Sequence, residues 1–546
     1  MRSIIDPVSR IEGHLRVEME VEGGRVSQAW VSGGLFRGME LILQGREPAD
    51  ATVISQRICG ICPVSHAHAS CMAGEAATGI ERLPNAGRIV RNIAEGAQFL
   101  HSNILWFYNL TGLDYIDPTN ALTANLASTY DLAQEWGTSM ADFKAVQDHL
   151  KSFVDNGQLS LFTGNWFSRE GYKLSPEMDL IGTAHYLEAL EYQAKASEIV
   201  GLVGGKMPHI MSSVPGGTTF VPTVNQLSDV LFRAQKLRDW IERTMVPDTL
   251  GIAEPYRDSF GYGQGVGRYV AWGVFNDPTQ LPENRYLPAG VIDDRGVLTL
   301  PDEKLIREYT GHSFYASDGN LNPREGKTDP LYPAGGADLN GKYTWTKGPS
   351  YNGKPHEAGP LARVLVAYMR GVPRIKELVD DMLSALGVPG ELSIFQSTLG
   401  RVAARNLETL YVAEQLVKWV EELIAAVTEG DSSFFTEPVQ TTGEGSGMWE
   451  APRGALYHFM RIVDNRIQDY QVIVPTTWNI APRDADGVPG PMETALEGVP
   501  VDDPEKPIDA LRTVHSFDPC VSCSVHVTEP ATGKSFDAVT HPWGVR

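Results

Sequence analysis

The sequence predicts a mainly helical α+β protein, in which a central bundle of long helices carries peripheral β-structure. Three observations support this prediction. Several segments of more than twenty residues show helical apolar periodicity, one alternating segment lies near the N-terminus, and a stretch rich in Gly, Pro, Asp and Asn interrupts the helical patterns. Apolar residues at the 3.6-residue period mark one face of a helix, whereas strict alternation marks a half-buried strand.

The N-terminal segment, residues 1–35, is predicted to form a β-hairpin. Residues 15–22 alternate between apolar and mostly acidic side chains, Gly23-Gly24 supplies a turn, and residues 26–31 return as a second strand. A two-residue glycine turn between alternating segments is typical of a hairpin.

Long helical patterns dominate the rest of the chain. Helices that exceed about twenty residues span more than about 30 Å each, and several of them in one chain favour a bundle. The predicted helices cover residues 89–110, 180–203, 224–245, 361–386 and 399–427.

Residues 273–358 contain few periodic runs and many turn-forming residues, so they are predicted to form an irregular surface excursion with short strands. The sequence shows no internal repeat, no low-complexity tract and no Pro/Ser-rich linker. We therefore expect residues 1–526 to form one large unit.

The composition excludes some classes of protein. The formal net charge is 46 − 68 = −22. This acidic balance argues against nucleic acid as a partner, because phosphate binding requires a basic surface. The sequence has no apolar run of the roughly 18 residues that a membrane span needs and no apolar signal-peptide core at its N-terminus. Export as the passenger of a partner stays open.

Four of the five cysteines form two CxxC pairs at opposite ends of the chain, Cys59/Cys62 and Cys520/Cys523. Thiolates are soft ligands that select Ni, Fe, Cu(I) and Zn. The large separation excludes a local zinc ribbon, but a zinc site closed by the whole fold remains an alternative. Neither pair lies in a βαβ pattern typical of a thioredoxin-like dithiol, and a c-type haem motif is excluded because Ser524 follows Cys523. Cys71 is expected to be a small buried apolar residue.

The sequences around both pairs resemble nickel–iron hydrogenase large subunits. Residues 57–67, RICGICPVSHA, match the first signature of that family, RxCGxCxxxH, and residues 515–526, HSFDPCVSCSVH, match the second, DPCxxCxxH. Further blocks of the family are matched, in the family's order, by residues 6–14, 36–40, 450–456 and 470–479. The respiratory complex I subunit of the same ancestry lacks the nickel cysteines, whereas this chain keeps all four.

The resemblance implies a Ni–Fe centre whose iron carries CO and two cyanides. Cys59 and Cys520 would be terminal nickel ligands, and Cys62 and Cys523 would bridge to iron. The positions around the diatomic ligands are matched by Arg453, Pro475 and Thr476. His66 matches a donor near the bridging sulfur, and a satisfied core histidine is the alternative for it. Guanidinium and hydroxyl groups are suitable donors to cyanide.

Two routes for the proton of H2 follow from the resemblance. Either Arg453 is the base, or the Cys520 thiolate takes the proton and passes it to Glu12. The alternative for Glu12 is that it is only a surface charge of the hairpin. The alternative for Arg453 is that it is only a structural ion-pair partner. A second site, for Mg²⁺ or a similar divalent ion, would use Glu40, the backbone carbonyl of Val472, and His526.

The chain departs from the family pattern at one place and extends it at another. Many relatives have His-Asp-His where this chain has His101-Ser102-Asn103, so an acidic side chain is missing near the site. The sequence also continues for 20 residues beyond His526. In the family, a dedicated protease removes such an extension after nickel insertion, so residues 527–546 resemble a maturation peptide.

The expected function is the reversible heterolytic oxidation of H2 to protons and electrons. With no cysteines left for iron–sulfur clusters, the chain would pass its electrons to an iron–sulfur small subunit across a large interface. The pattern resembles the membrane-associated uptake branch, with membrane attachment through partner subunits, on the periplasmic or outer face. The expected partners also include maturation factors for nickel insertion and further copies of the heterodimer. The rival interpretations are a non-catalytic scaffold and a zinc-stabilised structural protein.

Overall fold

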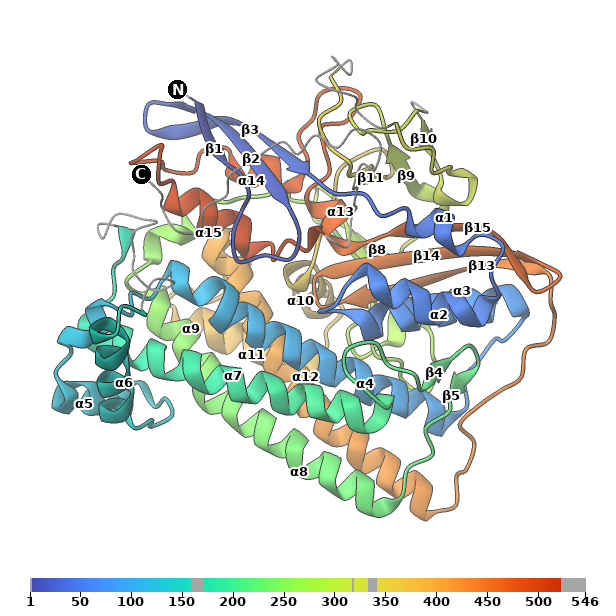
Figure 1. The fold of residues 1–546 in the computed structure, drawn as a ribbon, viewed down its shortest axis with the longest axis horizontal. Helices are drawn as coiled ribbons and strands as arrows, with labels where there is room; N and C mark the ends of the chain where they lie inside the picture. The colour runs from blue at the N-terminus through green and yellow to red at the C-terminus, as the bar shows by residue number, and fades with distance from the viewer. Residues whose placement is uncertain (1, 159–170, 317–318, 332–340, 522–546) are drawn as a thin grey trace.

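The computed structural model describes residues 2–158, 171–316, 319–331 and 341–521. Long helices lie together on one side of the molecule and small sheets lie on the other (Figure 1), so the α+β class is confirmed. The α-helices are α1 Met39–Leu43, α2 Pro48–Ser55, α3 Pro63–Thr78, α4 Asn85–Ile104, α5 Leu126–Trp136, α6 Phe143–Asp155, α7 Pro176–Gly204, α8 Val224–Trp240, α9 Val246–Ala253, α10 Pro360–Met369, α11 Pro373–Ala385, α12 Thr398–Thr428, α13 Pro475–Asn479, α14 Pro491–Leu496 and α15 Ile508–Ser516.

The strands form small, mostly antiparallel sheets. Their orders are β1-β2-β3, β10-β9-β11, β12-β6-β7-β8, β13-β14-β15 and β4-β5. The strands are β1 Arg2–Ile5, β2 Leu15–Glu22, β3 Arg25–Gly33, β4 Ser213–Val214, β5 Gly217–Thr218, β6 Tyr269–Ala271, β7 Gly290–Ile292, β8 Leu298–Thr299, β9 Ile306–Tyr309, β10 Asn320–Leu321, β11 Gly348–Tyr351, β12 Glu357–Ala358, β13 Gly443–Ala451, β14 Gly454–Val463 and β15 Arg466–Ile473.

The N-terminal sheet contains one strand more than the sequence predicted. β2 and β3 pair antiparallel, as the alternating pattern suggested, and the short strand β1 pairs with the other edge of β2. The apolar residues of β2 are buried against α14 and α15, which are near the other end of the sequence. The two ends of the described chain therefore lie side by side (Figure 1).

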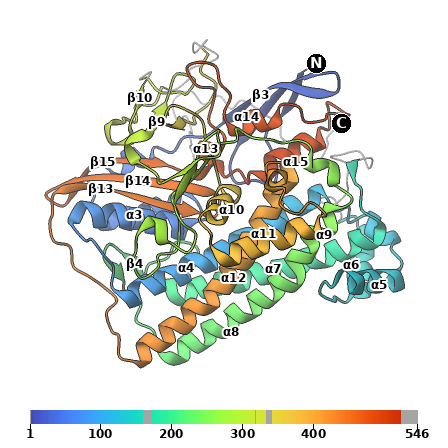
Figure 2. The ribbon, with the colours of Figure 1, turned by 180° about the vertical axis from the view of Figure 1, so that it is seen from behind.

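The helices α4, α7, α8 and α12 pack against one another, and Figure 2 shows α12 lying along α8 and α11. The single helix predicted over residues 361–386 is wrong, because α10 ends at Met369 and α11 begins at Pro373. Gly371 adopts a left-handed φ of 78° between them. Proline lacks the N–H that a continuing helix needs, so the helix does not run on through Pro373. The apolar period of the sequence nevertheless continues across this break.

The helix α3 is buried against the β13–β15 sheet. α3 packs against β13 and β14, and this contact requires glycine on the strand. A Cβ on Gly447 would lie 2.1 Å from the carbonyl oxygen of Ala69 in α3. This close approach places the first CxxC, at the start of α3, beside the turn between β13 and β14.

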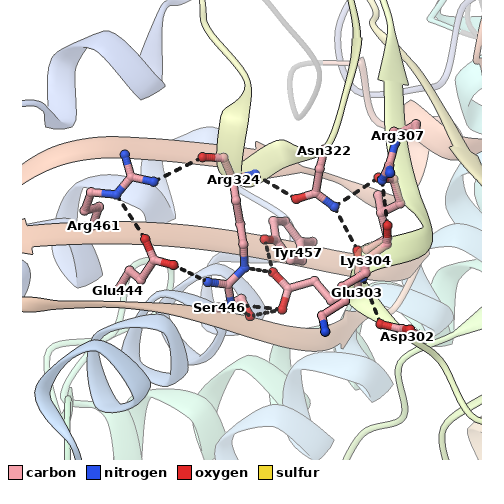
Figure 3. Close-up of polar contacts among 11 residues, drawn as sticks. Asp302, Glu303, Lys304, Arg307, Asn322, Arg324, Glu444, Ser446, Tyr457 and Arg461 are labelled. Atoms are coloured by element: carbon pink, nitrogen blue, oxygen red, sulfur yellow. Dashed lines mark hydrogen bonds and ion pairs between the residues drawn. The ribbon is translucent and has the colours of Figure 1, made fainter.

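The excursion of residues 273–358 is attached to this sheet by a polar cluster centred on Glu303 (Figure 3). The carboxylate accepts hydrogen bonds from Tyr457 Oη at 2.5 Å, Ser446 Oγ at 2.7 Å and Arg324 Nε at 2.7 Å. Arg324 also donates to Glu444 at 2.8 Å. Because Tyr457, Ser446 and Glu444 belong to β13 and β14, the cluster fixes the excursion over the sheet.

A buried charge network joins α10, α12 and β13. Arg363 donates to Glu408 at 2.5 Å and to Glu450 at 2.6 Å, and all three side chains are 0% exposed. Arg363→Met is expected to destabilise the protein by about 3–5 kcal/mol, because it leaves two carboxylates buried without their counter-charge. Differential scanning calorimetry should show a clearly lower melting temperature.

The exposed pair Lys144–Asp148 provides the control, because solvent screens its charges. Lys144→Ala should melt with the wild type. If Arg363→Met also melted with the wild type, the network would not stabilise the fold.

Within the described ranges, no helix has the length and apolarity needed to cross a bilayer.

Candidate metal centre

The first CxxC lies in a tight turn that ends in a helix. Residues 56–58 form a 3-10 turn, Cys59 is extended, and Cys62 occupies the N-cap position of α3 with Pro63 as the first helical residue. The backbone N–H groups of Ile61 and Cys62 donate to Cys59 Sγ at 3.3 and 3.1 Å. Such donors and the positive end of a helix favour the thiolate form of cysteine.

The second CxxC follows α15 and lies against the N-terminal segment. Cys520 forms a parallel bridge with Glu12, and the N–H of Val521 donates to the carbonyl oxygen of Glu12 at 2.7 Å. The N–H of Cys520 donates to Thr476 Oγ1 at 3.0 Å. Cys523 and His526, which the sequence assigned to the two metal sites, lie outside the described residues.

Cysteines from both ends of the chain converge. Cys59 Sγ and Cys520 Sγ are 3.4 Å apart although 461 residues separate them in the sequence. Cys59, Cys62 and Cys520 are 1%, 1% and 0% exposed and belong to the largest apolar core cluster. Among the described residues, no three His, Cys, Asp or Glu side chains by themselves have the geometry of a metal site. The fourth cysteine of the two pairs is not among them.

Arg453, in the turn between β13 and β14, faces the cysteines. Its Nη2 lies 2.9 Å from Asp518 Oδ1, and its Nη1 donates to Ser102 Oγ at 3.2 Å. Burial opposes the charge, but Asp518 and the three cysteines together raise the pKa of Arg453 well above its ordinary value. The guanidinium is therefore held in its protonated form beside the sulfurs.

Glu12 lies on the other side of Cys520. The Sγ of Cys520 is 3.3 Å from Glu12 Oε2, within the range of a hydrogen bond that involves sulfur. The backbone bridge between the two residues fixes this approach. The structure thus brings together the sulfur and the carboxylate that the sequence predicted as a proton relay.

The other residues predicted to lie beside the Ni–Fe centre are close to the same cluster. His66 is completely buried, and its Nε2 has no hydrogen-bond partner among the described residues. Pro475 begins α13 and Thr476 follows it. Because Thr476 Oγ1 accepts from the N–H of Cys520, its hydroxyl hydrogen is available for another acceptor.

The predicted divalent-ion site contains two glutamates on either side of one lysine, with Glu308 buried and Glu40 partly buried. Glu40 accepts the backbone N–H of Val472 at 2.9 Å, so this contact runs through the amide of Val472. Lys347 Nζ lies 3.6 Å from Glu40 and 3.7 Å from Glu308. Burial, together with Glu40, raises the pKa of Glu308 to about 7 despite Lys347.

Sequence reasoning did not assign roles to Asp518 and Arg405, which the structure places beside Arg453. Arg405 lies 3.1 Å from Asp518 Oδ2, so two guanidinium groups share one buried carboxylate. Asn103 accepts from Arg405 at 2.9 Å, while Ser102 accepts from Arg453. The segment that departs from the family pattern therefore provides neutral acceptors for both arginines. The position of Asp518 inside the second signature was the only sequence signal for this role.

The donor set fits a soft metal. The sulfurs of Cys59 and Cys520 approach each other and Cys62 belongs to the same buried core cluster, and thiolates are the ligands that nickel and iron accept. His66 Nε2 and Arg453 Nε are both buried without a hydrogen-bond partner in the described part of the chain. Donors of this kind are suited to groups bound between the sulfurs, the guanidinium and the imidazole.

Comparisons with known proteins give a consistent result. A family model described as nickel-dependent hydrogenase matches residues 37–526, and a model described as HoxL-like matches residues 3–32. The chain is 39% identical to the hydrogenase-2 large chain of Escherichia coli K12 over 97% of both chains. It is 38% identical to the uptake hydrogenase large subunit of Bradyrhizobium diazoefficiens, over 97% of this chain and 96% of that one. A solved structure of the Ni-Fe-Se hydrogenase from D. vulgaris Hildenborough in the reduced state superimposes with a TM-score of 0.81 at 35% identity, covering 96% of this chain and 100% of the other.

Proposed function

The chain belongs to the nickel-dependent hydrogenase large-subunit family, and we propose that Cys59, Cys62, Cys520 and Cys523 hold its Ni–Fe centre. It is the large, catalytic subunit of a nickel–iron hydrogenase, and H2 oxidation is the activity of this family. The observation that carries the site assignment is the 3.4 Å approach of Cys59 and Cys520 in the buried core.

When bound by these cysteines, the centre would supply a Lewis acid able to polarise H2 for heterolytic cleavage. We assign the next step, removal of the proton, to Cys520 and Glu12, because Glu12 Oε2 lies 3.3 Å from the sulfur. Arg453 is less suited to accept a proton, since Asp518 and Ser102 occupy its two terminal nitrogens. Its role is to hold positive charge beside the sulfurs, and its fixed planar group does so without reorganisation.

The iron would carry CO and two cyanides, with Arg453, Pro475 and Thr476 around them, and His66 would be a donor near the bridging sulfur. The Thr476 hydroxyl accepts from the N–H of Cys520 and can still donate its own hydrogen, and Arg453 Nε has no hydrogen-bond partner among the residues that the structure describes. Both support this assignment, because cyanide requires donors. A divalent ion such as Mg²⁺ would bind near Glu40, Val472 and His526. Glu40 and Glu308 provide the hard oxygen ligands that such a cation prefers.

We propose that residues 1–526 form one mature unit and that residues 527–546 are removed by a maturation protease after nickel-insertion factors have acted. The family match ends at residue 526, which supports this boundary. The relatives named as large chains and large subunits imply a small subunit as the partner. This partner would carry the iron–sulfur clusters and the membrane attachment, and heterodimers would assemble into higher oligomers.

The proposed function is tested on heterodimer purified from a host with the maturation machinery. Mass spectrometry of metals should find nickel and iron, and H2 should reduce a dye acceptor. Zinc without nickel, in protein that has lost residues 527–546, would support the zinc-stabilised alternative and contradict the proposal.

Glu12→Gln is expected to slow H2 oxidation by about 10²- to 10⁴-fold, since loss of a positioned acid–base group has this effect. The amide keeps the shape of the carboxylate but cannot accept the proton, so the nickel content should not change. Glu18→Gln, on β2 of the same N-terminal sheet, is the matched control and should remain active. Equal activity of the two variants would show that Glu12 is not in the proton route.

A further inference from the structure

A chain of three buried side chains leads from the cysteine cluster into the β13–β15 sheet. His66 Nδ1 lies 3.1 Å from His458 Nε2, and His458 Nδ1 lies 2.6 Å from Tyr470 Oη. All three residues are 0% exposed. The remaining nitrogen, His66 Nε2, is the one without a hydrogen-bond partner among the described residues.

The fold brings these side chains together from three elements. His66 is in the second turn of α3, four residues after Cys62. His458 in β14 and Tyr470 in β15 are diagonal neighbours, because Met460 pairs with Tyr470 and His458 pairs with Val472. Diagonal neighbours point to the same face of a sheet. That face carries α3, which packs on β13 and β14.

Both imidazoles are neutral. Burial lowers the pKa of His66 to about 4 and lowers the pKa of His458 well below its ordinary value. A neutral imidazole has one N–H donor and one acceptor nitrogen, so the direction of each hydrogen bond sets the direction of the next.

Two directions are available to the chain. If the phenol donates to His458 Nδ1, then His458 Nε2–H donates to His66 Nδ1, and His66 carries its hydrogen on Nε2. The opposite direction leaves a lone pair on His66 Nε2. His66 follows Cys62 by four residues at the start of α3, so the two residues are neighbours on one face of the helix. A buried lone pair facing thiolates is unfavourable, whereas an N–H donor facing them is stabilised.

We propose that Tyr470 and His458 are positioning residues that fix the tautomer of His66, so that His66 presents Nε2–H to the cysteine-bound centre. This inference rests on the proposed function, because the acceptor of that N–H is a cysteine sulfur or a group bound to it. His458 links the phenol to His66, and the tyrosine hydroxyl supplies the hydrogen that lets the chain of donors run toward the sulfurs. An N–H donated to a ligand sulfur withdraws electron density from the metals, as outer hydrogen bonds around metal sites do.

Tyr470→Phe tests the inference in mature heterodimer. The variant removes one hydroxyl and nothing else, so His458 Nδ1 loses its hydrogen-bond donor and the tautomers of both histidines are no longer fixed from this end. The infrared bands of the metal-bound CO and cyanides should shift from their wild-type positions, and activity should fall about 10- to 100-fold, as loss of such outer partners typically causes. Nickel content should be unchanged. Unshifted bands in nickel-loaded Tyr470→Phe would overturn the inference.

A matched control and a rescue separate this role from general packing. Tyr411→Phe also removes a buried tyrosine hydroxyl, one that donates to the carbonyl oxygen of Tyr286 at 2.9 Å, and its bands should not move. His458→Gln keeps an acceptor and a donor at similar separation and should keep the wild-type bands, whereas His458→Leu should shift them.

The two variants His458→Gln and His458→Leu also test the inference if the Tyr470→Phe protein does not accumulate. Equal bands in His458→Gln and His458→Leu would then overturn the inference. Failure of the proposed function is distinguishable from both results, because in that case the mature wild type itself would show no such bands.

Discussion

Replacing Cys520 with serine is expected to abolish nickel binding and H2 oxidation while the protein still folds. The sulfur is completely buried and lies 3.4 Å from Cys59 Sγ. The backbone N–H of Cys520 donates to Thr476 Oγ1, which fixes the residue in place. A serine oxygen has nearly the same size but is a harder and far less acidic ligand, so it does not replace a thiolate on nickel. Nickel per heterodimer and H2-dependent dye reduction are the two measurements.

Cys71→Ser is the matched control for this variant. Cys71 is also completely buried in α3, but it contacts Thr52 Oγ1 at 3.5 Å, and burial raises the pKa of its thiol to about 11. A thiol of this kind is not a metal ligand, so this variant should keep its nickel and its activity. Full nickel occupancy in Cys520→Ser, or equal nickel loss in both variants, would contradict the assignment of the cluster.

Arg453→Lys is expected to lower the rate of H2 oxidation by about 10²- to 10³-fold, the usual effect of removing one preorganised electrostatic group. Arginine reaches Asp518 and Ser102 with two nitrogens of one rigid plane, and the single amine of lysine does not reproduce this geometry. Nickel and iron should be retained, because the cysteines hold them. Steady-state kinetics and metal analysis of the same preparation measure both quantities.

Arg405→Lys separates two explanations for a loss of activity in Arg453→Lys. One is loss of the guanidinium beside the cysteines, and the other is loss of an ion-pair partner of Asp518. Arg405 shares that carboxylate at 3.1 Å, but the largest effects of charge on it come from Asp518, Arg453 and Glu408 rather than from the cysteines. Its replacement should therefore cost much less activity than replacement of Arg453. If the two variants were equally impaired, the loss would come from Asp518, and if Arg453→Lys were fully active, its proposed role would be wrong.

Sequence periodicity predicted the fold class and the position of most long helices, because an apolar stripe is a local property of the chain. The segment 361–386 shows the limit of this reasoning. Its apolar period continues through Gly371 and Pro373, where the backbone turns and α11 begins. The local signal for a break was present, but the period outweighed it. The strand β1 was missed for a related reason, since four residues are too few for a clear alternation.

The candidate site was predicted from motifs, whereas its surroundings were not. The contacts of Arg453 with Ser102, and of His66 with His458, join residues 351 and 392 positions apart. Pairings at such separations leave no periodic pattern in a single sequence. Arg405 has no unusual sequence context, and Tyr470 begins a matched block that gives it no role, so only the packing of α12 and β15 reveals what they contact.

The central claim is that the buried cysteines hold a Ni–Fe centre, and an infrared spectrum of the mature heterodimer tests it most directly. The protein must come from a host with the maturation machinery, and its mass must show that residues 527–546 are absent. We expect one band from metal-bound CO and two from cyanides in the region where protein itself does not absorb. Their absence from such protein would contradict the Ni–Fe assignment of Cys59, Cys62, Cys520 and Cys523.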